Sequence, residues 1–195
     1  PLEVNFSAAD LRAVVGADLS NADTTNAILP DGSIAGLDLR AGGTLLVRDY
    51  DGDPSRNQPP IPITVRYDMT MDPSSALRLV FEEDPWDSLI RLDPDIPVTL
   101  AGTLELTFAP DVDVRNQFGR RLKLFDWSDV QPTGTFDVVS QYSWDLTDLY
   151  TTGEVVLVPE PATLGLLPSG LLALSALALL RRRGPAPTAT VTRVG

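Results

Sequence analysis

The sequence predicts an all-β protein with three successive parts: a short right-handed β-helix, a β-sandwich or β-solenoid unit, and one C-terminal transmembrane helix. Three observations support this. Small and apolar residues recur with a period of five near the N-terminus, Val-, Thr- and Leu-rich runs alternate with Pro- and Gly-marked turns in the middle, and an uncharged span stands near the C-terminus. We divide the 195 residues into segments 1–43, 44–157, 158–183 and 184–195, the last a disordered tail.

The first segment is organised in units of five residues. Clear units are Ala17–Asn21, Ala22–Asn26 and Ala27–Asp31, preceded by a three-residue slip at Val14–Gly16. A period of five matches neither the α-helix nor the alternation of a strand. The central residue of each unit is expected to point inward, and these residues include Leu11, Leu19, Leu29, Ile34 and Leu39.

This pattern resembles the pentapeptide-repeat family, whose motif is A-(D/N)-L-x-x. The resemblance implies a right-handed, four-sided β-helix in which the central apolar side chain fills the interior beside a small residue two positions earlier. Four units make a coil of about 20 residues, and solenoids bury a core only by stacking coils. We therefore interpret residues 1–43 as the end of a longer array. The alternative is an Ala- and Asp-rich amphipathic helix that begins near Ser7.

The middle segment, 44–157, contains the pattern of short strands separated by turns. Alternation is clearest at Leu104, Leu106 and Phe108, which predicts a half-buried strand. The strands that we expect are Thr44–Asp49, Ile61–Met71, Ala76–Glu83, Ser88–Leu92, Val98–Phe108, Arg121–Asp126, Thr135–Val139 and Glu154–Val158. Strands at this spacing are typical of a sandwich or of a solenoid that continues the repeat.

The uncharged span runs from Ala162 to Leu180. As a helix it extends about 28 Å, which is close to the thickness of the hydrocarbon core of a bilayer. Arg181, Arg182 and Arg183 follow at once, which predicts that the C-terminal side lies in the cytoplasm. Besides a transmembrane helix with a sorting role, the alternatives are a plain membrane anchor and a buried core helix.

A Pro-Glu-Pro motif, formed by Pro159, Glu160 and Pro161, stands directly before this span. The order of motif, apolar span and arginine cluster resembles the PEP-CTERM sorting signal of exopolysaccharide-producing bacteria. The resemblance implies that a membrane-embedded exosortase recognises the motif and cleaves near it. Two prolines keep the motif extended and non-helical, so its backbone is accessible to a protease.

Two segments also resemble the closing unit of large PEP-CTERM and autotransporter-repeat passengers. They are residues 124–127 and 143–153, within a region of similarity that covers about Val98 to Val158. The resemblance implies that this unit closes the last strands before the sorting signal. It implies an architecture and no activity.

Composition excludes several function classes. The chain has no Cys and no His, which removes disulfides, thiol nucleophiles, the usual histidine base and His/Cys zinc sites. Of the charged residues, 11 basic and 26 acidic ones precede Glu160, a net charge of about −15 there. So acidic a body is repelled by phosphate backbones, and we expect no nucleic acid among its partners.

Three groups of residues are candidates for ligand chemistry. The acidic turn at Asp49, Asp51 and Asp53 has alternating oxygen ligands, but Pro54 and Pro60 stand where an EF-hand needs glycine and an acid, so we expect a polar turn. Neighbouring acids at 82–84 point to opposite faces of a strand and cannot form a glycosidase pair. The tryptophans, which are better explained by core packing than by a sugar-stacking platform, are Trp86, Trp127 and Trp144.

We therefore expect an exported structural or adhesive protein of the cell surface or extracellular matrix, and no enzyme. Its expected partners are an exosortase and the membrane, through an inner-membrane-anchored intermediate, with no cofactor and no metal site. The alternative is an extracellular module that binds exopolysaccharide. Exposed aromatic side chains aligned on one face favour that alternative.

Overall fold

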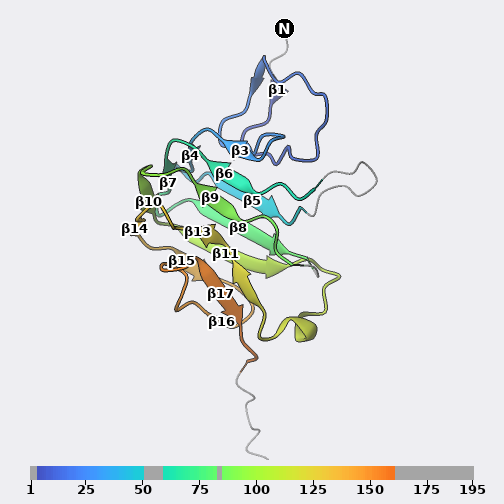
Figure 1. The fold of residues 1–195 in the computed structure, drawn as a ribbon, viewed down its shortest axis with the longest axis vertical. Helices are drawn as coiled ribbons and strands as arrows, with labels where there is room; N and C mark the ends of the chain where they lie inside the picture. The colour runs from blue at the N-terminus through green and yellow to red at the C-terminus, as the bar shows by residue number, and fades with distance from the viewer. Residues whose placement is uncertain (1–3, 51–58, 83–84, 161–195) are drawn as a thin grey trace, which may run out of the picture. The chain divides into compact units, whose positions relative to one another are not determined.

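The computed structural model describes residues 4–50, 59–82 and 85–160, which form a β-solenoid of about three turns (Figure 1). The prediction of an all-β protein is confirmed, and the middle segment is a solenoid and not a sandwich. Successive coils stack in chain order, from β1 at one end to β16 and β17 at the other.

Three sheets run along the solenoid, and every strand pairing in them is parallel. The first sheet contains β3 Ser33–Ile34, β6 Ile63–Val65, β9 Ile90–Leu92 and β13 Phe125–Asp126. The second contains β4 Leu37–Asp38, β7 Met69–Thr70, β10 Val98–Leu100 and β14 Thr133–Gly134. The third contains β5 Thr44–Arg48, β8 Ala76–Phe81, β11 Thr103–Phe108 and β15 Asp137–Val139. The first two sheets continue across residues 43 and 44, because β3 pairs with β6 and β4 pairs with β7.

The core consists of apolar side chains that stack on their counterparts in the next coil. In the third sheet, Leu77 lies in register between Leu45 and Leu104, and all three are buried. In the first sheet, Val65 pairs with both Ile34 and Leu92 in the same way. Period-two alternation selects these residues, since each coil places the same face of its strand inward.

Corners divide two of the strands that the sequence predicts. The run expected at 61–71 is interrupted by Arg66–Asp68, and the run expected at 98–108 is interrupted before Thr103. At the second break Gly102 has φ of +66°, and a Cβ there would lie 2.4 Å from the carbonyl oxygen of Asp72. Only glycine accepts this turn and this close approach. The alternation expected at Leu104–Phe108 is confirmed, since every second side chain is buried.

The first coil keeps the five-residue frame. Strands β1 Val4–Asn5 and β2 Ala22–Asp23 are parallel, with Val4 opposite Ala22, the first residues of the five-residue units 4–8 and 22–26. An amphipathic helix is therefore wrong for this segment. Ser7 and Thr25, hydrogen-bonded across the coils, are 18 positions apart instead of about 20, because the slip at Val14–Gly16 replaces one unit. The right-handed winding and the pentapeptide-repeat family stay predictions.

The inward residues are predicted correctly in part. Leu11, Ile34 and Leu39 are buried, whereas Leu19 and Leu29 are only half-buried. Leu29 is displaced because it opens a tight turn: its carbonyl accepts from the N–H of Gly32 at 2.8 Å, and its N–H donates to the carbonyl of Ser33 at 2.9 Å. The preceding residue, Ile28, fills the core in its place and is fully buried.

Aspartate and asparagine side chains hold the corners of the coils. At each of these corners the side-chain oxygen accepts from the N–H two residues further on, as in an Asx turn. The pairs are Asn5–Ser7, Asp10–Arg12, Asp18–Ser20, Asp23–Thr25, Asp31–Ser33, Asp38–Arg40 and Asp72–Ser74. The Ser33 hydroxyl lowers the pKa of Asp31, and the Arg40 guanidinium lowers the pKa of Asp38 to about 2, with the backbone N–H adding to each effect. Six of the 27 acidic residues thus have a structural role at these corners.

A buried arginine joins the first coil to the coils after it. Arg12 is 1% exposed and forms an ion pair with Asp10 at 2.6 Å. Its guanidinium also donates to the carbonyl oxygens of Arg48 and Ile61, both at 2.9 Å, and to the Ser88 hydroxyl at 2.8 Å. The planar fork of arginine suits this role, because its five N–H groups point outward in fixed directions.

Candidate functional site

An antiparallel sheet closes the C-terminal end of the solenoid. Its strands are β12 Arg121–Lys123, β17 Glu154–Leu157 and β16 Trp144–Asp145, with β17 in the middle. Both pairings of β17 are antiparallel, so the parallel stacking of coils ends here. Arg121 reinforces the closure with ion pairs to Glu154 at 2.9 Å and Asp148 at 3.2 Å.

The turn between β16 and β17 is fixed by the backbone and by one tryptophan. The Asp148 carbonyl accepts from the N–H of Gly153 at 3.0 Å. Gly153 has φ of +79°, and a Cβ there would lie 2.0 Å from the Phe125 carbonyl oxygen, so glycine is required. Trp127 donates from Nε1 to the carbonyl of Leu149 at 2.7 Å and ties the turn to the preceding corner.

The described part of the chain ends within the Pro-Glu-Pro motif, at Glu160. Within residues 4–160, the last backbone N–H that donates to a backbone carbonyl is that of Val158, which bonds the Ser143 carbonyl at 3.0 Å. Pro159 follows and has no N–H with which to continue a ladder. Pro159 and Glu160 are both exposed, whereas Pro161 lies outside the described residues. The first two motif residues are therefore accessible and follow β17 after a single residue, Val158.

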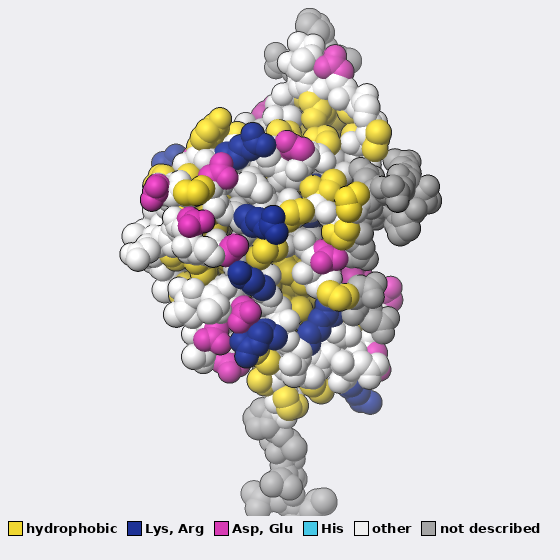
Figure 2. Space-filling model, in the orientation of Figure 1, with side chains coloured by type: hydrophobic (Ala, Val, Ile, Leu, Met, Phe, Trp, Pro, Cys, Tyr) yellow, Lys and Arg dark blue, Asp and Glu magenta, His cyan; other side chains and the backbone are white. Residues whose placement is uncertain are grey.

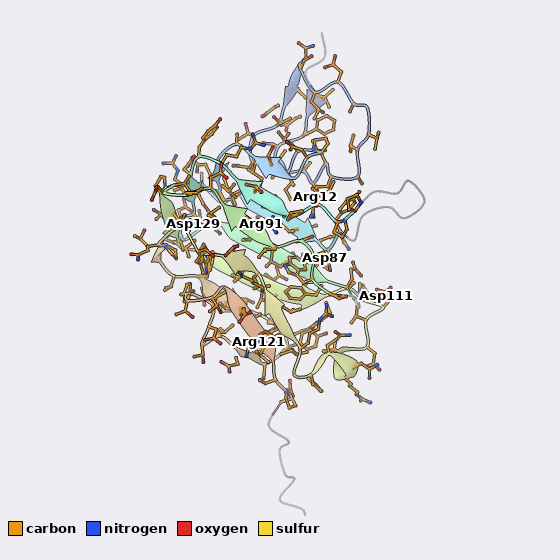
Figure 3. The ribbon with its side chains drawn as sticks, viewed as in Figure 1. Arg12, Asp87, Arg91, Asp111, Arg121 and Asp129 are labelled. Atoms are coloured by element: carbon orange, nitrogen blue, oxygen red, sulfur yellow. The ribbon has the colours of Figure 1, made fainter. Side chains whose placement is uncertain are left out.

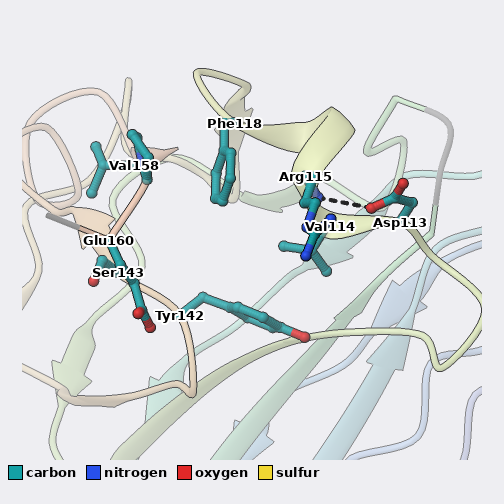
Figure 4. Close-up of a pocket in the computed structure, with 9 residues that line it drawn as sticks. Asp113, Val114, Arg115, Phe118, Tyr142, Ser143, Val158 and Glu160 are labelled. Carbon is teal, nitrogen blue, oxygen red and sulfur yellow. Dashed lines mark hydrogen bonds between the residues drawn. The ribbon is translucent and has the colours of Figure 1, made fainter. Parts of the chain in front are cut away.

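The same two residues line a groove of about 460 Å³ (Figure 4). Phe118 and Tyr142 project into the space between residues 158–160 and the 3₁₀ helix η2, Val114–Gln117. Asp113 caps η2 by accepting from the N–H of Arg115 at 3.1 Å. The full lining is Asp113, Val114, Arg115, Phe118, Tyr142, Ser143, Val158, Pro159 and Glu160. Such a mixture of ring surface and charge can hold an extended peptide.

Aromatic packing supports the floor of this groove. Tyr142 meets Phe108 edge to face at 5.5 Å, and Phe108 stacks on Trp144 at 5.9 Å between ring centroids. Trp86 packs edge to face against Phe81 at 5.0 Å and is buried. With Trp127 stacked on Phe125, the tryptophans are packing residues, as expected, and form no aligned exposed platform.

The other predicted candidates are partly outside the described residues. Asp49 accepts from the N–H groups of Asp87 at 2.9 Å and Ser88 at 3.2 Å, so it holds the neighbouring coil. Residues 51–53 and 83–84 lie outside the described ranges, and Glu82 is half-buried. Within the described ranges, no group of three or more acidic side chains is arranged to hold a metal ion.

The apolar span from Ala162 to Leu180 and the arginines Arg181, Arg182 and Arg183 also lie outside the described residues. None of the helices in residues 4–50, 59–82 and 85–160 is long and apolar enough to cross a membrane. The predicted transmembrane helix therefore stays a prediction.

Comparisons with protein-family models, curated proteins and solved structures found no match to this chain. Functional inference therefore rests on the residues themselves. Sequence reasoning missed Phe118 and Tyr142 as groove residues. Neither lies in a periodic pattern. They come together only because the hairpin of β16 and β17, which closes the solenoid, lies beside η2.

Proposed function

We propose that this protein is an exported structural or adhesive protein of the cell surface or extracellular matrix, sorted by an exosortase through Pro159, Glu160 and Pro161. The supporting observation is that, among the described residues, the last backbone N–H to donate a backbone hydrogen bond is that of Val158, directly before the motif, and that Pro159 and Glu160 are exposed. Proteases bind extended backbone, and the exposed residues Pro159 and Glu160 can present such backbone to an exosortase.

The proposed route has an intermediate that is anchored in the inner membrane. The span from Ala162 to Leu180 inserts, and Arg181, Arg182 and Arg183 stay in the cytoplasm. Cleavage near the motif then releases the solenoid, whose closing hairpin is complete upstream of the cut. An acidic solenoid suits a structural or adhesive role, because its stacked coils present continuous sides to a partner.

Replacement of the motif glutamate tests this proposal. Glu160→Ala leaves the apolar span and the arginines intact, so the protein still inserts into the membrane. In a host with an exosortase, we expect the variant to stay in the inner-membrane fraction while the wild type reaches the surface. Asp137→Ala is the matched control, because Asp137 is also exposed but lies on β15, away from the motif. Equal surface amounts of Glu160→Ala and control contradict the proposal.

A further inference from the structure

One corner of the solenoid lengthens from coil to coil. It joins the first sheet to the second and contains Ala35–Gly36, then Arg66–Asp68, then Asp93–Pro97, and finally Trp127–Pro132. The sheets on either side keep their parallel register throughout, so the added residues are not needed to continue the coil. They form the walls of a cleft.

Two adjoining cavities, of about 630 and 500 Å³, lie along this corner. They share Trp127, Val130 and Gln131, which makes the cleft elongated. The polar and aromatic residues that also line it are Asp95, Ser128, Asp129, Tyr150 and Thr151. A cleft of this size, with ring edges and several hydrogen-bonding groups, is typical of a ligand site.

Fixed contacts hold the walls of the cleft in place. The N–H of Asp95 donates to the carbonyl of Asp129 at 3.2 Å, which brings the two corners together. Asp95 has φ of +61°, a left-handed conformation that is uncommon outside glycine. Tyr150 stacks beside Phe136, and its hydroxyl accepts from the Phe136 N–H at 2.9 Å. The cleft is therefore largely preformed.

The charge of the cleft is one-sided. Asp95 and Asp129 line it, both exposed, and the lining includes no lysine or arginine. In Figure 2 acidic side chains gather at the left edge, where Figure 3 places Asp129, while basic side chains run down the middle of the face through Arg91 and Arg121. A ligand that carries positive charge is favoured here, and a polyanion is repelled.

We propose that this corner cleft binds a polysaccharide that carries free amino groups. Asp95 and Asp129 pair with its ammonium groups, Gln131 and the hydroxyls of Ser128 and Thr151 bond its hydroxyl groups, and a sugar ring lies against Tyr150, while the buried Trp127 supports the floor of the cleft. The elongated shape of the cleft suits an oligosaccharide chain better than a single sugar. The proposal does not depend on sorting, so it stands or fails separately from the proposed function.

Calorimetric titration of the purified full chain with a hexamer of β-1,4-linked glucosamine tests the proposal. The measurement is made at a pH at which the amino groups are protonated, and the matched hexamer of glucose is titrated in parallel. We expect the glucosamine hexamer to bind more tightly than the glucose hexamer, and its affinity to fall as salt is raised. The double variant Asp95→Asn/Asp129→Asn should weaken binding about tenfold or more. Asparagine keeps the left-handed conformation at position 95, so the fold is preserved.

The matched control is Asp87→Asn/Asp111→Asn, which makes the same change of charge at two exposed residues that do not line the cleft. Asp111 lies on the opposite side of the view from Asp129 (Figure 3). The affinity of this control variant for the glucosamine hexamer should stay within about twofold of wild type. The proposal is overturned if no heat of binding appears at millimolar sugar, if the glucose hexamer binds equally well, or if the control weakens binding as much as the cleft variant.

Discussion

Replacement of the buried arginine by methionine should destabilise the protein more than any exposed substitution. In Arg12→Met the carboxylate of Asp10 loses its ion pair, and the carbonyl of Ile61 loses a hydrogen bond from a charged donor. Arg48 and Ser88 keep their bond to each other at 2.9 Å, which limits the damage. Removal of one partner of a buried pair costs about 3–5 kcal/mol, and we expect a loss of unfolding free energy in that range.

Urea unfolding of the full chain, followed by circular dichroism, measures this loss. The control is Arg66→Met, because Arg66 is half-exposed and its contact with Asp31 is 3.4 Å long. It should cost less than about 1 kcal/mol. Arg12→Lys should fall between the two, since a single ammonium cannot reach all the acceptors of the guanidinium. If Arg12→Met costs no more than Arg66→Met, the arginine does not join the coils in the way that its contacts indicate.

Three further predictions concern the coils and the cap. Ile28→Asp buries a carboxylate in the core and should lower the free energy of unfolding by several kcal/mol more than Leu29→Asp, as measured by urea unfolding. A larger loss at Leu29 contradicts the observed register. Gly153→Ala should lower the melting temperature far more than Gly16→Ala, because both have positive φ but only Gly153 faces a backbone carbonyl, so equal shifts refute the close approach. The corner aspartates have lowered pKa values, so their charged forms stabilise the fold fully above pH 3.8. This stability is lost as the pH falls toward about 2, the pKa of Asp38. Asp38→Asn should therefore flatten the dependence of urea unfolding midpoints on pH below 4, and an unchanged dependence contradicts this role.

Local pattern predicted much of the fold. Alternation identified strands such as β5 and β11, because one face of each is buried. The five-residue frame placed Leu11 and Ile34 in the core correctly. Leu29 failed because Pro30 and Gly32 introduce a turn within the repeat, and turn chemistry overrides a periodic expectation there.

Features that depend on distant segments could not be predicted. The sequence predicts that Trp127 packs in the core, but its hydrogen bond to the Leu149 carbonyl forms only once β16 and β17 have folded back beside it. The same holds for the groove beside Pro159 and for the cleft between Asp95 and Asp129, whose walls come from different coils. Stacking decides which corners meet, and no local pattern encodes it.

The intact mass of the surface form tests the central claim most directly. Wild-type protein is collected from the surface of a host that has an exosortase and is measured by mass spectrometry. The proposed route predicts a chain that ends near Pro161 and lacks the span to Leu180 together with Arg181, Arg182 and Arg183. A surface protein whose mass includes every residue through Gly195 contradicts it, and the C-terminal segment is then only an anchor.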